Sequence, residues 1–273
     1  MPDLPIGIVG GMGPWAGFEL CRHITSHTRA QRDQEHLTLY LASEPALVPD
    51  RTEYLLGNGR INPADVVAAT IGRLAQIGAR VVGIACNTIH APAYWQRILE
   101  LLAGGQIDIR LISIVEAVAE HLSSRYAPGS RIGVLGTAGT VATNIYGPAL
   151  ARRGFAVHYP GEAQVAAVHR AIYDPRFGIK SHFDPVPDAA RREVEDAIVG
   201  LAESGVEAVV LGCTELPFAV SSAAKWARAG AGSGAAARAR ARRSGGAGAL
   251  ALRPDQSRND AYFGARMAAL SSS

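Results

Sequence analysis

A strand-and-turn pattern that occurs twice is the feature that most restricts the fold of this 273-residue chain. The segment IGIVG begins at Ile6, and the similar segment IGVLG begins at Ile132, 126 residues later. The segment VGIACNT contains Cys86, and the similar segment VVLGCTE contains Cys213, 127 residues later. Two matches at nearly one spacing predict two similar lobes, because a duplicated supersecondary unit repeats with a fixed period.

Short apolar segments alternate with longer segments of helical periodicity, which is typical of parallel sheets covered by helices on both faces. The expected strands are Ile6–Val9, Leu37–Leu41, Val81–Ala85, Leu111–Ile114, Arg131–Leu135, Ala156–Tyr159 and Ala208–Leu211. The expected helices are Trp15–Thr28, Pro63–Ile77, Tyr94–Leu102, Val115–Ser124, Tyr146–Arg153, Ala163–Ile172 and Asp188–Glu203. We therefore expect an α/β fold of two pseudo-symmetric lobes, each a parallel sheet flanked by helices, over residues 1–115 and 116–217, followed by a C-terminal return segment over 218–273.

Cys86 and Cys213 each follow an apolar strand, and ligands of open α/β sheets bind at the carboxyl ends of strands. We expect the two thiols on opposite walls of one cleft between the lobes. Backbone N–H groups at a strand-to-helix turn are expected to lower a thiol pKa from about 8.5 toward neutrality, where proton transfer is efficient. Cys21 lies within a helical pattern and is interpreted as a small buried hydrophobe.

Two acid/base groups on opposite faces of a carbon are what inversion of a stereocentre by proton transfer requires. One thiolate removes the proton, and the other thiol delivers a proton to the opposite face. Hydrogen-bond donors must hold the developing negative charge. Asn87, Thr88, Thr137 and Thr214 are the candidates for holding the α-carboxylate and amino group of such a substrate.

The composition disfavours several other classes. Three cysteines are too few for a disulfide framework and predict thiols in a reducing compartment. No apolar run approaches the roughly 18 residues of a membrane span, and no basic signal-peptide region begins the chain, so we expect a cytoplasmic protein without a membrane partner. The sequence contains no C-x-x-C motif, which disfavours a redox role for the cysteines. The eight histidines have no spacing typical of a zinc site, so no metal is expected.

The net charge of +3 depends on residues 223–250, which contain six basic residues and no acidic residue. Without that Ala/Gly/Arg-rich segment the formal charge is −3, so we expect no nucleic-acid partner. The segment has three interpretations: a flexible linker, a frame-shifted stretch or a basic interaction arm. A short helix is expected over Asn259–Leu270.

Five blocks resemble, in order, the signature of the aspartate/glutamate racemase family. They are Gly10–Pro14 (GGMGP), Pro49–Thr52 (PDRT), Cys86–His90 (CNTIH), Gly136–Thr140 (GTAGT) and Gly212–Leu216 (GCTEL). The resemblance covers about residues 5 to 220 and implies a two-lobed fold, two catalytic cysteines, no pyridoxal phosphate or other cofactor, and a homodimer. Members continue into a last helix packed on the first lobe, and residues 223–250 depart from that pattern.

The resemblance further implies that Arg51 and Lys180 bind the side-chain carboxylate of aspartate, since Arg offers a bidentate fork and Lys a point charge. Met12 lies in the first Gly-rich turn, which is expected to line the substrate site and not to bind a nucleotide. Glu215 has two interpretations, as a helix cap or as a group that tunes the neighbouring thiol. His90 has a polarising or a structural role.

The predicted function is therefore racemisation of aspartate. A glutamate or broad-specificity racemase is the nearest alternative, and related folds perform hydantoin racemisation, maleate isomerisation and decarboxylation. A non-catalytic dicarboxylate-binding protein is the alternative from another class.

Overall fold

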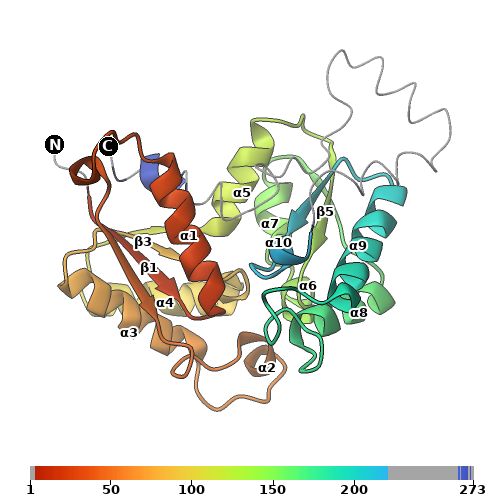
Figure 1. Ribbon diagram of the computed structural model, residues 1–273, viewed down its shortest axis with the longest axis horizontal. Coiled ribbons are helices and arrows are strands. Elements are labelled where there is room, and N and C mark those ends of the chain that lie inside the picture. The colour runs from red at the N-terminus through yellow and green to blue at the C-terminus, as the bar shows by residue number, and fades with distance from the viewer. Residues whose placement is uncertain (1–3, 221–263, 265, 270, 272–273) are drawn as a thin grey trace.

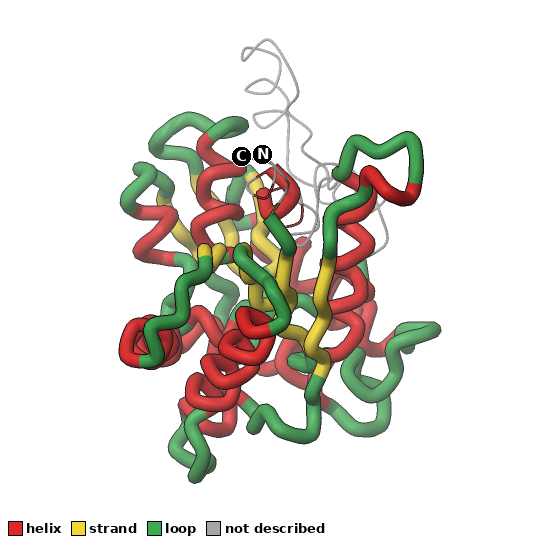
Figure 2. The backbone as a smooth tube through the Cα atoms, turned by 90° about the vertical axis from the view of Figure 1, so that its left-hand side faces the viewer, coloured by secondary structure: helices red, strands yellow, loops and turns green. Residues whose placement is uncertain are grey.

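The computed structural model describes residues 4–220, 264, 266–269 and 271. Two parallel sheets lie side by side with helices around them, as Figure 1 shows and Figure 2 shows from the side. The first sheet has the order β2-β1-β3-β4 and the second the order β6-β5-β7. The strands are β1 (Ile6–Gly10), β2 (Leu39–Ser43), β3 (Val81–Ile84), β4 (Arg110–Ile112), β5 (Arg131–Leu135), β6 (Ala156–His158) and β7 (Ala208–Leu211). The predicted α/β class and two-lobed fold are confirmed, while the bounds 1–115, 116–217 and 218–273 stay a prediction.

The sheets repeat one arrangement. In the first, β1 lies between β2 and β3, and in the second, β5 lies between β6 and β7. In each sheet, the strand that precedes the Gly-rich turn (β1 or β5) is therefore paired with the strand that precedes the cysteine (β3 or β7). Two sheets built this way each bring one thiol beside one Gly-rich turn.

The helices cover the sheets and begin at recognisable signals. Asp50, Asn62 and Ser113 accept hydrogen bonds from backbone N–H groups in the first turns of α2, α3 and α5, and proline begins α1, α3 and α4. The helices are α1 (Pro14–His27), α2 (Arg51–Leu55), α3 (Pro63–Gln76), α4 (Pro92–Gly104), α5 (Ile114–Ser123), α6 (Ala138–Ala142), α7 (Gly147–Ala151), α8 (Glu162–Tyr173), α9 (Asp188–Glu203) and α10 (Leu216–Ala219). No helix among these described residues is long and apolar enough to cross a bilayer.

The observed elements differ from the predicted ones at several bounds and in three short helices. β4 ends at Ile112 and not at Ile114, because Ser113 caps α5 and Ile114 is the first residue of that helix. β2 begins at Leu39 and not at Leu37, because β1 begins at Ile6 and its parallel register pairs Ile6 with Leu39. The short helices α2, α6 and α10 were not predicted, since four or five residues are too few to show helical periodicity.

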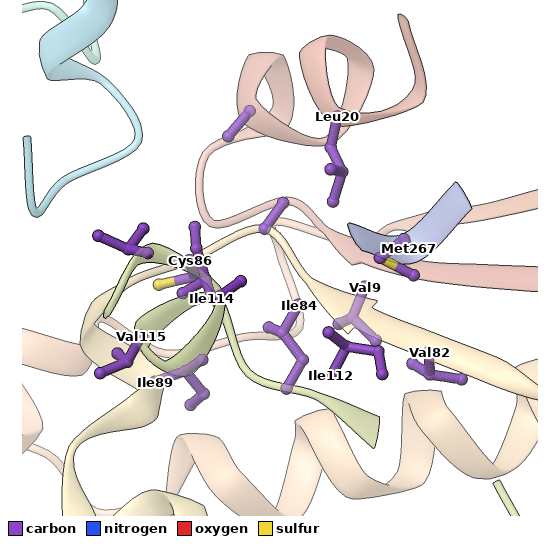
Figure 3. Packing of buried hydrophobic residues seen from close by; sticks show 14 of the residues in the cluster. Val9, Leu20, Val82, Ile84, Cys86, Ile89, Ile112, Ile114, Val115 and Met267 are labelled. Atoms are coloured by element: carbon purple, nitrogen blue, oxygen red, sulfur yellow. The ribbon is translucent and has the colours of Figure 1, made fainter. Parts of the chain in front are cut away.

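The last described residues pack on the first lobe. Residues 264, 266–269 and 271 are helical, and the backbone N–H of Leu4 donates to the carbonyl of Ser271 at 2.8 Å. Met267 is fully buried and belongs to the same core as Val9 and Leu20 (Figure 3). The rest of the expected helix over 259–270, and the segment 223–250, lie outside the described residues.

Replacing Met267 with alanine is expected to lower the free energy of unfolding by about 2–5 kcal/mol, because a fully buried side chain leaves a cavity. Arg266→Ala is the control, since Arg266 makes an exposed ion pair with Glu120 that contributes no more than about 1 kcal/mol. Urea denaturation measures both. Equal stability of the Met267→Ala and Arg266→Ala proteins would contradict the docking of this segment on the first lobe.

Candidate active site

Cys86 and Cys213 lie at equivalent points of the two lobes. Cys86 follows Ala85, whose N–H donates to the carbonyl of Val9 in β1 at 2.9 Å. Cys213 follows Gly212, whose N–H donates to the carbonyl of Leu135 in β5 at 2.6 Å. Both cysteines are free thiols and nearly inaccessible, with exposed fractions of 3% and 6%. Figure 3 shows the Cys86 sulfur near Ile114, at the margin of the core.

Polar contacts join the two lobes next to these cysteines. The Tyr146 hydroxyl of the second lobe donates to Oδ1 of Asn87, the residue after Cys86. The Gly13 N–H of the first lobe donates to Oε1 of Glu215, two residues after Cys213, at 2.9 Å. We call the region that these bonds join the lobe junction, and both cysteines lie in it.

Three threonine hydroxyls form a chain through the lobe junction. Thr137 caps α6 and lies 3.1 Å from the Thr140 hydroxyl, which in turn lies 3.5 Å from the Thr88 hydroxyl. The Thr140 hydroxyl also donates to the carbonyl of Gly212, beside Cys213. The structure thus brings Thr88 and Thr137 together through Thr140, which the sequence showed only as the last residue of the block Gly136–Thr140.

Aromatic rings meet across the same junction. Trp15 of α1 stacks on Phe183 with 4.3 Å between ring centroids, and Phe183 packs edge-on against Phe218 of α10 at 4.3 Å. Trp15 lies two residues after Gly13, whose N–H donates to Glu215. The aromatic contact is therefore made by the same turn of the first lobe that contacts Glu215.

Glu215 is the centre of the polar contacts around Cys213. Its Oε2 accepts from the Cys213 thiol at 2.9 Å and from the Thr214 hydroxyl at 3.2 Å. Its Oε1 accepts from Lys180 Nζ at 2.8 Å and from the Gly13 N–H. The Glu215 side chain makes no cap bond to α10, so of its two sequence interpretations the structure supports contact with the thiol.

The thiol pKa of Cys213 does not follow the sequence expectation. Burial, followed by the negative charge of Glu215, raises the pKa of Cys213 well above its ordinary value, and Lys180 only partly opposes this. The prediction that turn N–H groups bring this pKa toward neutrality is therefore wrong for Cys213, because burial and a carboxylate outweigh the turn.

Glu215 and Lys180 are both held in their charged forms. Burial opposes ionisation of Glu215. The Lys180 ammonium and the hydrogen bonds that the carboxylate accepts outweigh burial and lower the pKa of Glu215 to about 2. Burial likewise opposes the charge on Lys180, yet the charge of Glu215 raises the Lys180 pKa above its usual range. The site therefore contains a buried carboxylate paired with a largely buried ammonium.

Arg51 is a buried cation at the start of α2. Among the described residues its guanidinium donates to the carbonyl oxygens of Pro49 at 3.1 Å and Met12 at 3.3 Å, and its Nε has no partner there. Within the described part of the chain no carboxylate forms an ion pair with it. Its Nε and the buried, unpartnered Nδ2 of Asn87 are two donors that an anion would satisfy.

Arg51 is also electrostatically linked to a thiol. Burial opposes its charge, but the negative form of Cys86 is the largest of the interactions that raise the Arg51 pKa above its ordinary value. The Tyr94 hydroxyl fixes the Arg51 backbone by donating to its carbonyl at 2.7 Å. Met12 is buried beside it, with an exposed fraction of 2%.

His90 supports the loop that carries Cys86. Its Nδ1 lies 2.8 Å from the Cys86 carbonyl, its Nε2 lies 3.4 Å from the Ile114 N–H, and its ring stacks on Trp95 at 4.6 Å. Burial lowers its pKa to about 4, so the ring is neutral at physiological pH. A neutral ring that donates from Nδ1 and accepts at Nε2 satisfies both contacts, which supports the structural interpretation.

The protein is an α/β protein of two lobes, each built on a parallel sheet. Each lobe places one buried thiol at the end of an equivalent strand, and both thiols lie in the lobe junction. The model of the Asp/Glu/Hydantoin racemase family matches residues 9–229. The chain belongs to this family of racemases.

Known proteins are similar over much of the chain. A glutamate racemase from Chlorobaculum parvum is 28% identical over 189 residues, which are 66% of this chain and 64% of that protein. The structure of the aspartate racemase from Picrophilus torridus has a TM-score of 0.64 and 27% identity, covering 80% of this chain and 84% of that one. A Yersinia pestis protein described as an Asp/Glu racemase has a TM-score of 0.67 at 22% identity and covers 99% of this chain and 100% of its own, which shows the shared fold. The match to the Chlorobaculum enzyme spans less than two thirds of that enzyme's length.

Proposed function

We propose that this protein is a cofactor-independent aspartate racemase that transfers protons through Cys86 and Cys213. The observation that carries the proposal is Arg51, a buried guanidinium with an unpartnered Nε beside Cys86. Among the described residues no carboxylate hydrogen-bonds to this guanidinium, although the charges of Asp50 and Glu215 act on it. Such a cation is a favourable site for a substrate carboxylate, because bidentate arginine–carboxylate bonds are strong and directional.

In the proposed reaction a thiolate at one cysteine takes the α-proton, and the C–H electron pair stays on the α-carbon, delocalised toward the α-carboxylate. The thiol of the other cysteine then gives its proton to the opposite face and becomes a thiolate. The cysteines exchange protonation states in each turnover, so the reverse reaction uses the same groups in opposite roles. The Asn87 Nδ2 and the hydroxyls of the junction are the donors that hold the carboxylate where charge develops.

Lys180 has a more complex role than the resemblance implied. Its ammonium already donates to Glu215, but an ammonium has three N–H donors and this carboxylate oxygen takes one. Arg51 is therefore the principal partner proposed for the side-chain carboxylate of aspartate, and Lys180 adds a second, shared charge.

Glutamate is the second candidate substrate, and the similarity to the Chlorobaculum parvum glutamate racemase favours it. The similarity to the Picrophilus torridus aspartate racemase, which extends over more of both chains, favours aspartate. Both amino acids carry the side-chain carboxylate that Arg51 would bind.

Chiral analysis of products from a panel of L-amino acids tests the substrate. We expect the D-enantiomer to form fastest from aspartate, more slowly from glutamate and not measurably from alanine, which lacks the second carboxylate. Faster conversion of glutamate would move the assignment to the alternative. Binding of aspartate without conversion of any amino acid would instead identify a non-catalytic dicarboxylate-binding protein.

A further inference from the structure

The contacts of the Glu215 carboxylate are divided between its two oxygens. One oxygen receives the Cys213 and Thr214 donors, and the other receives Lys180 and the N–H of Gly13. Lys180 precedes Glu215 by 35 residues, and Gly13 belongs to the other lobe. The carboxylate is therefore fixed in place by groups that are remote in the sequence, with one oxygen directed at the thiol.

We propose that Glu215 is a positioning residue that keeps the Cys213 proton on sulfur, so that Cys213 is the proton donor of the resting enzyme. The inference rests on the proposed racemase function and deepens it. A carboxylate at 2.9 Å accepts a hydrogen bond from a thiol but repels a thiolate, so it favours the protonated form. Removal of the α-proton in the first turnover is thereby assigned to Cys86.

The same geometry accounts for the reverse step. When Cys213 gives its proton to the α-carbon, its S–H bond breaks and the new C–H bond forms, which leaves a thiolate next to the ionised Glu215. That thiolate is a strong base, because recovering a proton relieves the repulsion. The two enantiomers have equal free energies, so the difference between the two thiols cannot make kcat/KM differ between the two directions. The difference is therefore measured by titration of the Cys213 thiol.

Among the charged and titratable groups around Cys213, Glu215 has the largest effect on the pKa of the thiol. Glu215 disfavours its thiolate and Lys180 favours it, while Tyr173 is a neutral phenol whose own pKa is raised by burial first and then by nearby negative charge that includes Cys213. Arg51 acts on Glu215, where its charge favours the carboxylate. Lys180 therefore has a second task, which is to keep Glu215 ionised.

Replacement of Glu215 tests the inference by titration of a single thiol. The parent protein carries Cys21→Ser and Cys86→Ser, which leaves Cys213 as the one cysteine of three. Ultraviolet absorbance of the thiolate is followed against pH, and the titration of the same protein with Cys213→Ser is subtracted to remove tyrosine ionisation. In the Glu215→Gln protein we expect the thiolate to form at a pH at least about 1 unit lower than in the parent.

Glu207→Gln is the matched control, because Glu207 accepts hydrogen bonds from Ser130 and Arg131 before the start of the strand that leads to Cys213. We expect it to leave the midpoint unchanged. Glu215→Asp retains the charge but moves it away from sulfur, so its midpoint should lie between those of the parent and the Gln variant. The Asp variant decides the question if the Gln variant does not fold.

An unchanged or higher midpoint in the Glu215→Gln protein, or in Glu215→Asp if that variant alone folds, would overturn the inference. In the enzyme with all three cysteines, the alkaline limb of the racemisation rate should move to lower pH in Glu215→Gln, since Cys213 loses its proton earlier. The two proposals fail separately. An active wild-type enzyme with an unshifted thiol rejects only the role of Glu215, and an inactive wild-type protein with a shifted thiol rejects only the racemase.

Discussion

Replacing either Cys86 or Cys213 with alanine is expected to lower kcat for racemisation by at least about 10³-fold, since each replacement removes the only proposed acid/base group on one face of the α-carbon. Each thiol lies at the end of a strand of its own lobe, and in the proposed mechanism each serves one face of the α-carbon. Measurement of enantiomer conversion by polarimetry, with circular dichroism to verify folding, tests the pair. Both cysteines are buried, so the folded state must be verified before kcat is compared.

Cys21→Ala is the matched control for this pair. Cys21 is partly buried in α1, where burial raises its thiol pKa, and the proposed mechanism gives it no role. Its replacement should leave kcat within about twofold, as for other substitutions outside a catalytic unit. Full activity of the Cys213→Ala enzyme would reject the two-thiol mechanism even if the protein proved to be a racemase.

Arg51→Met is expected to lower kcat/KM for aspartate by about 10²- to 10⁴-fold, because two charge-assisted hydrogen bonds of about 1.5–3 kcal/mol each are lost. Arg51→Lys should recover part of this, since lysine restores the charge but not the planar fork. Initial-rate kinetics with aspartate as substrate measure both variants. The loss should be much smaller for any residual reaction with an amino acid that has no side-chain carboxylate.

Arg97→Met is the control, because Arg97 makes a half-exposed ion pair with Asp65 on the surface. It should change kcat/KM by less than about fivefold, in keeping with the small contribution of such pairs. If Arg51→Met and Arg97→Met had equal effects, Arg51 would not be the carboxylate partner.

The repeat and the apolar strands allowed the fold to be predicted because both are visible in the order of residues, without knowledge of any tertiary contact. The paired strands β1 and β3, and likewise β5 and β7, are short apolar runs. The spacing of the two cysteines already implied one thiol per lobe. The start of β2 was missed because it depends on the register with β1, which the periodicity of its own segment does not contain.

The electrostatics of the site could not be predicted for a related reason. The turn after Cys213 indicates backbone N–H groups near the thiol, but its sequence indicates neither the burial of the thiol nor the placement of the Glu215 side chain. The ion pair of Lys180 with Glu215 joins residues 35 positions apart, and no periodicity indicates it. The adjacency of Glu215 to Cys213 was the one available signal, and it left a helix cap equally open.

The packing of Met267 shows the same limit for the end of the chain. Residues 223–250 offer no apolar pattern, so the expected return segment over 218–273 depended on the family resemblance and not on the periodicity of the chain. The contact of Ser271 with Leu4 depends on a tertiary arrangement that joins positions near opposite ends of the chain.

Incorporation of deuterium at the α-carbon of aspartate, measured by NMR in heavy water with no added cofactor, tests the central claim most directly. We expect the wild-type protein to incorporate solvent deuterium into aspartate supplied as either enantiomer, and racemisation to accompany this exchange. Absence of α-exchange with both enantiomers of aspartate would contradict the claim that the two buried thiols of this protein racemise that amino acid.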